Sequence, residues 1–129
     1  MRITVDEARG FFEHASQQIE GLTPDILPGE GFEYYAKGPL CVAFHLSPWP
    51  DVWFCHYGVK PEGWGGLVAP AQEILAYFFE LKGASRIIGW TPEDNRAACA
   101  FAKRVGFSED GKLKAKSRNI IMQGWTPWG

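Results

Sequence analysis

The sequence predicts a mixed α/β fold, a mostly antiparallel sheet of about six strands with helices on both faces. The order of elements is the first reason: a helix, three strands, a helix, a strand, a helix and two strands. Short turns join the first three strands, which favours an antiparallel meander. A helix follows the third strand, and such a crossover favours a parallel neighbour. The 129 residues are expected to form one domain, 1–129.

Composition narrows the class of protein. The chain is 46% hydrophobic and 22% charged, as in an ordinary globular protein, and its net charge of −2 argues against nucleic-acid binding. It contains neither a signal-peptide core nor an apolar run long enough to cross a membrane. Cys41, Cys55 and Cys99 form no Cys-x-x-Cys motif, so we expect reduced thiols, a cytoplasmic location and no metal site.

The first half begins with a capping box. Thr4 can bond the backbone at Glu7, and Glu7 can reach back, so we expect a helix over residues 5–20. Residues 21–31 are rich in Pro and Gly and form a loop. Strands are expected over residues 32–36, 40–46 and 52–59, with turns at residues 37–39 and 47–51.

The second half opens with a glycine-rich loop, residues 62–69, followed by Pro70 in a first helical turn. The apolar stripe of this helix is expected to be Ala71, Ile74, Leu75, Phe78 and Leu81, and Gly83 ends it. A buried strand over residues 85–90 comes next. Thr91 is expected to cap the last helix, with Pro92 at its first position, and Gly106 stops it. Strands over residues 107–109 and 117–124 are expected to pair as a hairpin across Asp110-Gly111.

The glycine-rich loop predicts an anion site. Glycines let a ligand approach the backbone closely, and Gly63, Gly65 and Gly66 stand just before a helix. The first N–H groups of a helix have no internal partner and attract negative charge. The alternative is an ordinary connecting loop.

Two segments resemble a known family. Asn95-Arg96-Ala97-Ala98, followed by Val105-Gly106-Phe107, is similar to the Asn-x-x-Ala … Gly-Phe segment of the GNAT superfamily of acyl-CoA-dependent N-acyltransferases. Val59-Lys60-Pro61-Glu62 resembles the Val-x-Pro-Glu that ends the fourth strand of that family. The resemblance covers about the last two-thirds of the chain. It implies acetyl-CoA, or another acyl-CoA, as cofactor and a primary amine of a small molecule or protein as acceptor.

The resemblance also implies where the cofactor lies. The fourth and fifth strands of the family splay apart, and the pantetheine arm occupies the wedge, here between residues 53–59 and 86–90. Strand backbone would pair with the pantetheine amides, and the glycine loop would hold the pyrophosphate. The cofactor-binding residues expected on this basis are Gly58, Val59, Gly63, Gly65, Gly66, Leu67 and Asn95.

The chain departs from the family pattern in its loop and last helix. Trp64 stands where the family has Arg or Gln, and Leu67 and Ala69 stand at its two glycine positions. Pro70 removes one N–H donor. Ala102 stands where many members carry a Tyr that protonates the departing thiolate. These departures leave an alternative open: a non-catalytic GNAT-fold binding or structural protein, such as a phage- or assembly-associated relative, with a degraded CoA site.

Amine acylation needs a base and a proton donor. His56, on the third expected strand, is the candidate base, although strict alternation turns it away from Cys55 and Val59. A β-bulge, common in this strand of the family, would turn it back. Tyr57 is the candidate acid, and Cys99 is the alternative.

The acceptor pocket is expected on the early strands and at the wedge. Glu33, Tyr35, His45 and Trp90 are the candidate acceptor-binding residues. For each, ordinary strand surface or core is the alternative. The sequence leaves the oligomeric state open, a homodimer included.

Overall fold

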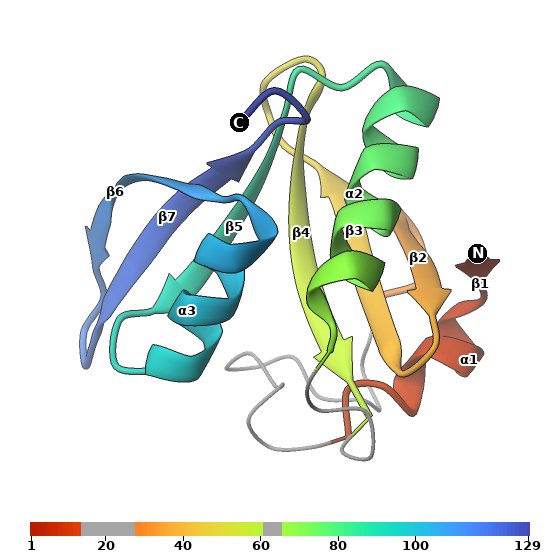
Figure 1. Cartoon of the computed structure of the whole chain (residues 1–129), viewed down its shortest axis with the longest axis horizontal. Coiled ribbons are helices and arrows are strands. Elements are labelled where there is room, and N and C mark those ends of the chain that lie inside the picture. Colours follow the sequence, from red (N-terminus) through yellow and green to blue (C-terminus); the bar gives the residue numbers. More distant parts are fainter. Residues whose placement is uncertain (14–27, 61–65) are drawn as a thin grey trace.

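The computed structural model describes residues 1–13, 28–60 and 66–129. They form a seven-stranded sheet in the order β1-β2-β3-β4-β5-β7-β6, antiparallel throughout except between β4 and β5 (Figure 1). In chain order the elements are β1 (Arg2–Ile3), α1 (Val5–Arg9), β2 (Phe32–Lys37), β3 (Leu40–Leu46), β4 (Val52–Val59), α2 (Val68–Lys82), β5 (Arg86–Pro92), α3 (Arg96–Val105), β6 (Ser108–Lys114) and β7 (Asn119–Trp125). The predicted fold class is therefore confirmed, with β1 as the strand that the sequence did not reveal.

Helices cover both faces of the sheet, as the alternation along β3 shows. Leu40, Val42 and Phe44 lie in the core cluster that includes the buried faces of α2 and α3. Cys41 and Ala43 point to the opposite face, where they pack in a second cluster with α1 and the turn after it. We call these the α2 face and the α1 face. None of the helices in the described ranges is both long and apolar enough to cross a membrane.

Several local predictions are confirmed. The strands expected over 40–46 and 52–59 have these bounds. The strand expected over 32–36 is β2, which is one residue longer. The Thr4–Glu7 capping box is present. Gly83 and Gly106 end α2 and α3 with φ of 60° and 117°, a conformation that favours glycine.

The helix predicted over 5–20 is too long within the described residues. α1 ends at Arg9, and the chain turns through Phe11 and Phe12, which are both buried in the α1-face cluster. Their spacing is typical of a helical stripe, but both residues belong to a turn that packs against Gly58 of β4. Residues 14–20, and the expected loop up to residue 27, lie outside the described residues.

The predicted cap of α3 is wrong. Thr91 and Pro92 extend β5, because they pair with Ile121 and Ile120 of β7. Asn95 is the actual N-cap, and its side-chain oxygen accepts a hydrogen bond from the Ala98 N–H at 3.2 Å. Tertiary pairing with β7 thus overrides the local Thr-Pro signal.

Two further predictions in the second half are wrong. The last hairpin does not turn at Asp110-Gly111: a bulge interrupts the β6–β7 pairing between Glu109 and Gly111, and the chain turns at residues 115–118. Leu81 is 54% exposed, whereas Phe79 is buried in its place against Trp125. The C-terminal strand thus widens the apolar face of α2.

Candidate active site between β4 and β5

The central feature of the sheet is the divergence of its two parallel strands. β4 and β5 pair at only three positions, Val52 with Arg86, Trp53 with Ile87 and Phe54 with Ile88. Beyond them β5 pairs with β7 alone and β4 with β3 alone, so residues 55–59 have one edge that no strand of the described ranges covers. Figure 1 shows the two strands together at their upper ends and apart below. The predicted splay is confirmed.

On the α2 face, aromatic rings line this gap. The Tyr57 ring lies edge-on to Phe101 of α3 and to Phe107, with centroids 5.6 and 6.3 Å away. Its hydroxyl is buried and has no hydrogen-bond partner within the part of the chain that the structure describes. Burial raises the pKa of Tyr57 well above its usual value, so this hydroxyl stays protonated and can donate.

On the α1 face, Trp90 bridges the two strands. Its ring centroid lies 4.8 Å from that of Phe54 and 5.5 Å from that of His56. Because rings also lie on the α2 face, side chains occupy both faces of the gap at the level of residues 54–57. The sequence placed Trp90 in the acceptor pocket, and the structure places it directly beside His56.

His56 points to the α1 face, and the bulge expected in β4 is absent. β3 and β4 pair without a register shift from Leu40↔Val59 to Leu46↔Trp53. The Nε2 of His56 lies 3.2 Å from the Nε2 of His45 on β3. Burial, and secondarily the charge that His45 can carry, lowers the pKa of His56 to about 4. His56 is therefore a neutral imidazole near pH 7, the form that can accept a proton.

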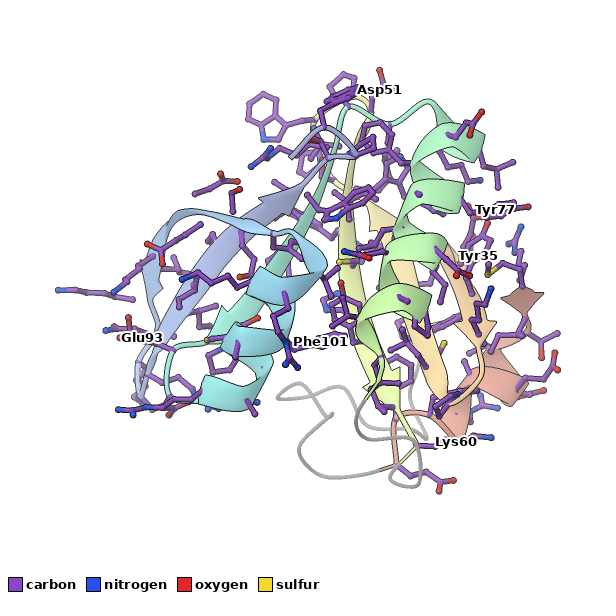
Figure 2. The ribbon with its side chains drawn as sticks, viewed as in Figure 1. Tyr35, Asp51, Lys60, Tyr77, Glu93 and Phe101 are labelled. Carbon is purple, nitrogen blue, oxygen red and sulfur yellow. The ribbon has the colours of Figure 1, made fainter. Side chains whose placement is uncertain are left out.

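Glu33 and Tyr35 do not join this group. Both face α2, and the Tyr35 hydroxyl donates to the Glu33 carboxylate at 2.8 Å. Glu33 also pairs with the Lys82 ammonium at 2.7 Å and the Arg2 guanidinium at 3.5 Å. Figure 2 shows Tyr35 next to Tyr77 of α2. Of the four expected acceptor-binding residues, only His45 and Trp90 lie with His56.

Among the described residues, no side chain caps the N-terminus of α2. Leu67 is its N-cap residue and makes no side-chain hydrogen bond, and no acidic residue stands in the first turn. Gly66, with φ of 64°, precedes it. Exposed N–H groups at such an end favour an anion. Gly63 and Gly65 lie outside the described residues.

The remaining expected cofactor residues have structural partners. Gly58 lies under Phe12, and Val59 is 6% exposed in the α2-face cluster. Asn95 uses its side-chain oxygen to cap α3. Within the ranges that the structure covers, no group of three His, Cys, Asp or Glu side chains is arranged to hold a metal ion.

Solved structures share this architecture. An acetyltransferase of the GNAT family from Bacillus anthracis superposes with a TM-score of 0.73 at 13% identity, covering 96% of this chain and 90% of the other. The chain has the GNAT fold. The ribosomal-protein-S5-alanine acetyltransferase from Vibrio fischeri also superposes, with a TM-score of 0.72 at 12% identity. This match covers 100% of this chain and 93% of the other.

A third match carries ligands. The microcin C7 self-immunity acetyltransferase, in complex with acetyl-CoA and AMP, gives a TM-score of 0.60 at 18% identity over 73% of this chain and 57% of the other. By sequence, no family model and no curated protein matches the chain. The likeness to these GNAT structures thus rests on tertiary structure, and at these identities it establishes the fold.

The contact between His45 and His56 was not anticipated, although a signal for it existed. A turn at residues 47–51 joins the predicted strands over 40–46 and 52–59. Antiparallel pairing about that turn places His45 and His56 diagonally opposite each other on one face.

Proposed function

We propose that this protein is an acyl-CoA-dependent N-acyltransferase, which transfers an acetyl group to a primary amine of a small molecule or a protein. The observation that carries the proposal is the splay of β4 and β5 within a GNAT fold, with a neutral imidazole beside the uncovered edge. The N-terminus of α2, which no side chain of the described residues caps, supports a phosphate site. The three free cysteines fit a reducing compartment, and we propose a cytoplasmic location.

The chain supplies the groups that amine acylation requires. Acetyl-CoA would supply the activated acyl group, held by the edge of residues 55–59 and by the first turn of α2. His56 would take the proton from the acceptor ammonium, because its neutral form predominates near pH 7. Backbone N–H groups on the uncovered edge can stabilise the oxyanion. Tyr57 would protonate the departing thiolate, in place of the Tyr that Ala102 replaces.

The second candidate is a GNAT-fold binding or structural protein without catalysis. The rings on both faces of the gap at residues 54–57 favour it, because a pantetheine arm would have to displace them or pass beyond them. Acetyl-CoA separates the two. A ligand that binds the native state raises the melting temperature, so the transferase should melt higher with millimolar acetyl-CoA. Free thiol release on a panel of amines and N-terminal alanine peptides then tests transfer.

A matched pair of variants tests the phosphate site. Ala69 is exposed in the first turn of α2, so Ala69→Asp places a negative charge where the pyrophosphate should bind. The acid interacts favourably with the helix N-terminus and should not lower stability. We expect Ala69→Asp to weaken acetyl-CoA binding roughly tenfold, equivalent to about 1.4 kcal/mol, and the neutral isostere Ala69→Asn to bind nearly as the parent. Equal affinities in calorimetry would contradict this site.

A further inference from the structure

The two imidazoles of His45 and His56 make direct contact. Their Nε2 atoms are 3.2 Å apart, and their ring planes differ by 8°. The ring centroids are 5.3 Å apart, much further than the two Nε2 atoms at 3.2 Å. The rings therefore meet at their edges and do not lie one over the other. This contact needs one N–H and one lone pair, because two of either would repel.

The hydrogen bond fixes the tautomers of the neutral pair. The donor ring carries its proton on Nε2 and keeps a free lone pair on Nδ1, whereas the acceptor ring carries its proton on Nδ1. If His56 is the donor, its Nδ1 remains available as a base. Any proton that enters the pair can then cross the shared bond without either side chain moving.

The surroundings favour charge on His45 over charge on His56. Burial lowers the pKa of both imidazoles, and that of His56 falls to about 4, with the charge on His45 as the second cause. His56 lies beside the gap, packed against Trp90, and His45 lies one strand further away, stacked on Phe32 at 4.4 Å. The transfer of a proton from His56 to His45 is therefore favourable.

We propose that His45 and His56 form a proton relay, in which His56 takes a proton at Nδ1 and passes its Nε2 proton to His45. The proposal rests on the acyltransferase function and assigns to His45 the role of a positioning residue. The step breaks the amine N–H bond and the His56 Nε2–H bond, and forms His56 Nδ1–H and His45 Nε2–H. The positive charge moves from the ammonium to His45, which releases its Nδ1 proton to water. To restore the starting tautomers, His45 takes a proton from water at Nδ1 and returns its Nε2 proton to His56, which releases its Nδ1 proton to water.

The described groups that contact the relay are neutral. Phe32, Phe54 and Trp90 make the ring contacts on β2, β4 and β5. Further along the same face, burial raises the pKa of Tyr34 and of Cys41 to about 12, so both stay uncharged near pH 7. Within the described ranges no ion pair involves either imidazole. Among the described residues, the pair is therefore the titrating unit of this part of the α1 face.

Two substitutions of His45 separate a relay from simple orientation. In His45→Gln, the amide oxygen can still accept the His56 N–H but cannot be protonated. His45→Phe removes the hydrogen bond and keeps a ring against Phe32. With acetyl-CoA and the best acceptor of the amine panel, the relay predicts a loss in kcat of roughly tenfold or more for both variants, with acetyl-CoA affinity unchanged. The acidic limb of their pH profile should also move to lower pH, because the proton can no longer rest on His45 and must be held by the more deeply buried His56.

The outcomes decide between the roles. A His45→Gln variant with the parent rate would mean that the hydrogen bond alone suffices, and would overturn the relay. Parent rates in both variants would give His45 a purely structural role. A His45→Gln, His56→Gln double variant should be no slower than His56→Gln alone, because residues that act as a unit are not additive.

A measurement without substrate keeps the two proposals separable. Nitrogen-15 spectra of the histidine rings in the unliganded protein should show one Nε2–H and one Nδ1–H tautomer. Both rings should report the same first protonation, since strongly coupled groups titrate as a pair. Two independent titration curves would overturn the relay. This titration uses neither cofactor nor acceptor, so it reports on the pair even if the proposed acyltransferase function fails.

Discussion

Gly58 lies where β4 has no room for a side chain, and adding one methyl group tests how the turn after α1 is packed. A Cβ built at Gly58 would come within 2.8 Å of the Phe11 carbonyl oxygen and of two Phe12 ring atoms. Real Cβ atoms do not approach backbone so closely, so Gly58→Ala must displace the Phe11–Phe12 turn. Overpacking of this kind costs about 1–3 kcal/mol. The loss of chain entropy in the unfolded state offsets roughly 0.4–1 kcal/mol.

The net loss expected for Gly58→Ala is therefore about 1–2 kcal/mol in the free energy of unfolding, or roughly 3–10 °C in melting temperature for a chain of this size. Gly89, across the gap on β5, is the matched control. A Cβ there would lie 3.6 Å from Phe107 and 3.7 Å from the Cys55 sulfur, which is ordinary contact. Urea and thermal unfolding of both variants give the comparison. If Gly58→Ala were as stable as Gly89→Ala, the close packing of the turn on β4 would be refuted.

Two further predictions concern the cap of α3 and the response to pH. Asn95→Ala should lower the free energy of unfolding by about 1 kcal/mol in urea, because the Ala98 N–H loses its hydrogen-bond acceptor. Asn95→Asp should keep the hydrogen bond and the stability. Equal losses of stability in the two variants would exclude capping by Asn95. The folded-state pKa of His56 is depressed to about 4 from an ordinary 6.5, so the unfolded chain binds more protons between these values. Stability should therefore be fully present above about pH 6.5 and fall, by on the order of 3 kcal/mol, as the pH drops towards 4. His56→Leu should flatten this dependence between pH 4.5 and 7.5, and an unchanged slope would argue against a buried neutral imidazole.

The sequence determined most of the elements and the general class of the fold. Strands β3 and β4 follow from runs of β-branched and aromatic residues between strong turn signals. The Thr4–Glu7 capping box starts α1, and Gly83 and Gly106 end α2 and α3, through contacts with residues only a few positions away. Such signals are local, so they can be read without knowing the partners. The order of these elements, together with two short motifs, was enough to predict a GNAT-like sheet.

Only the tertiary structure decided which residues share a site. Glu33, Tyr35, His45 and Trp90 were predicted together, but the side to which each side chain points divides them between the two faces. Thr91 reads locally as a helix cap, yet pairing with β7 makes it part of β5, and Asn95 takes its place. Strand register and pairing are long-range properties, fixed by the packing of both faces at once. For that reason the turn at residues 47–51 could only suggest that His45 meets His56, and the register in the folded chain fixes this contact.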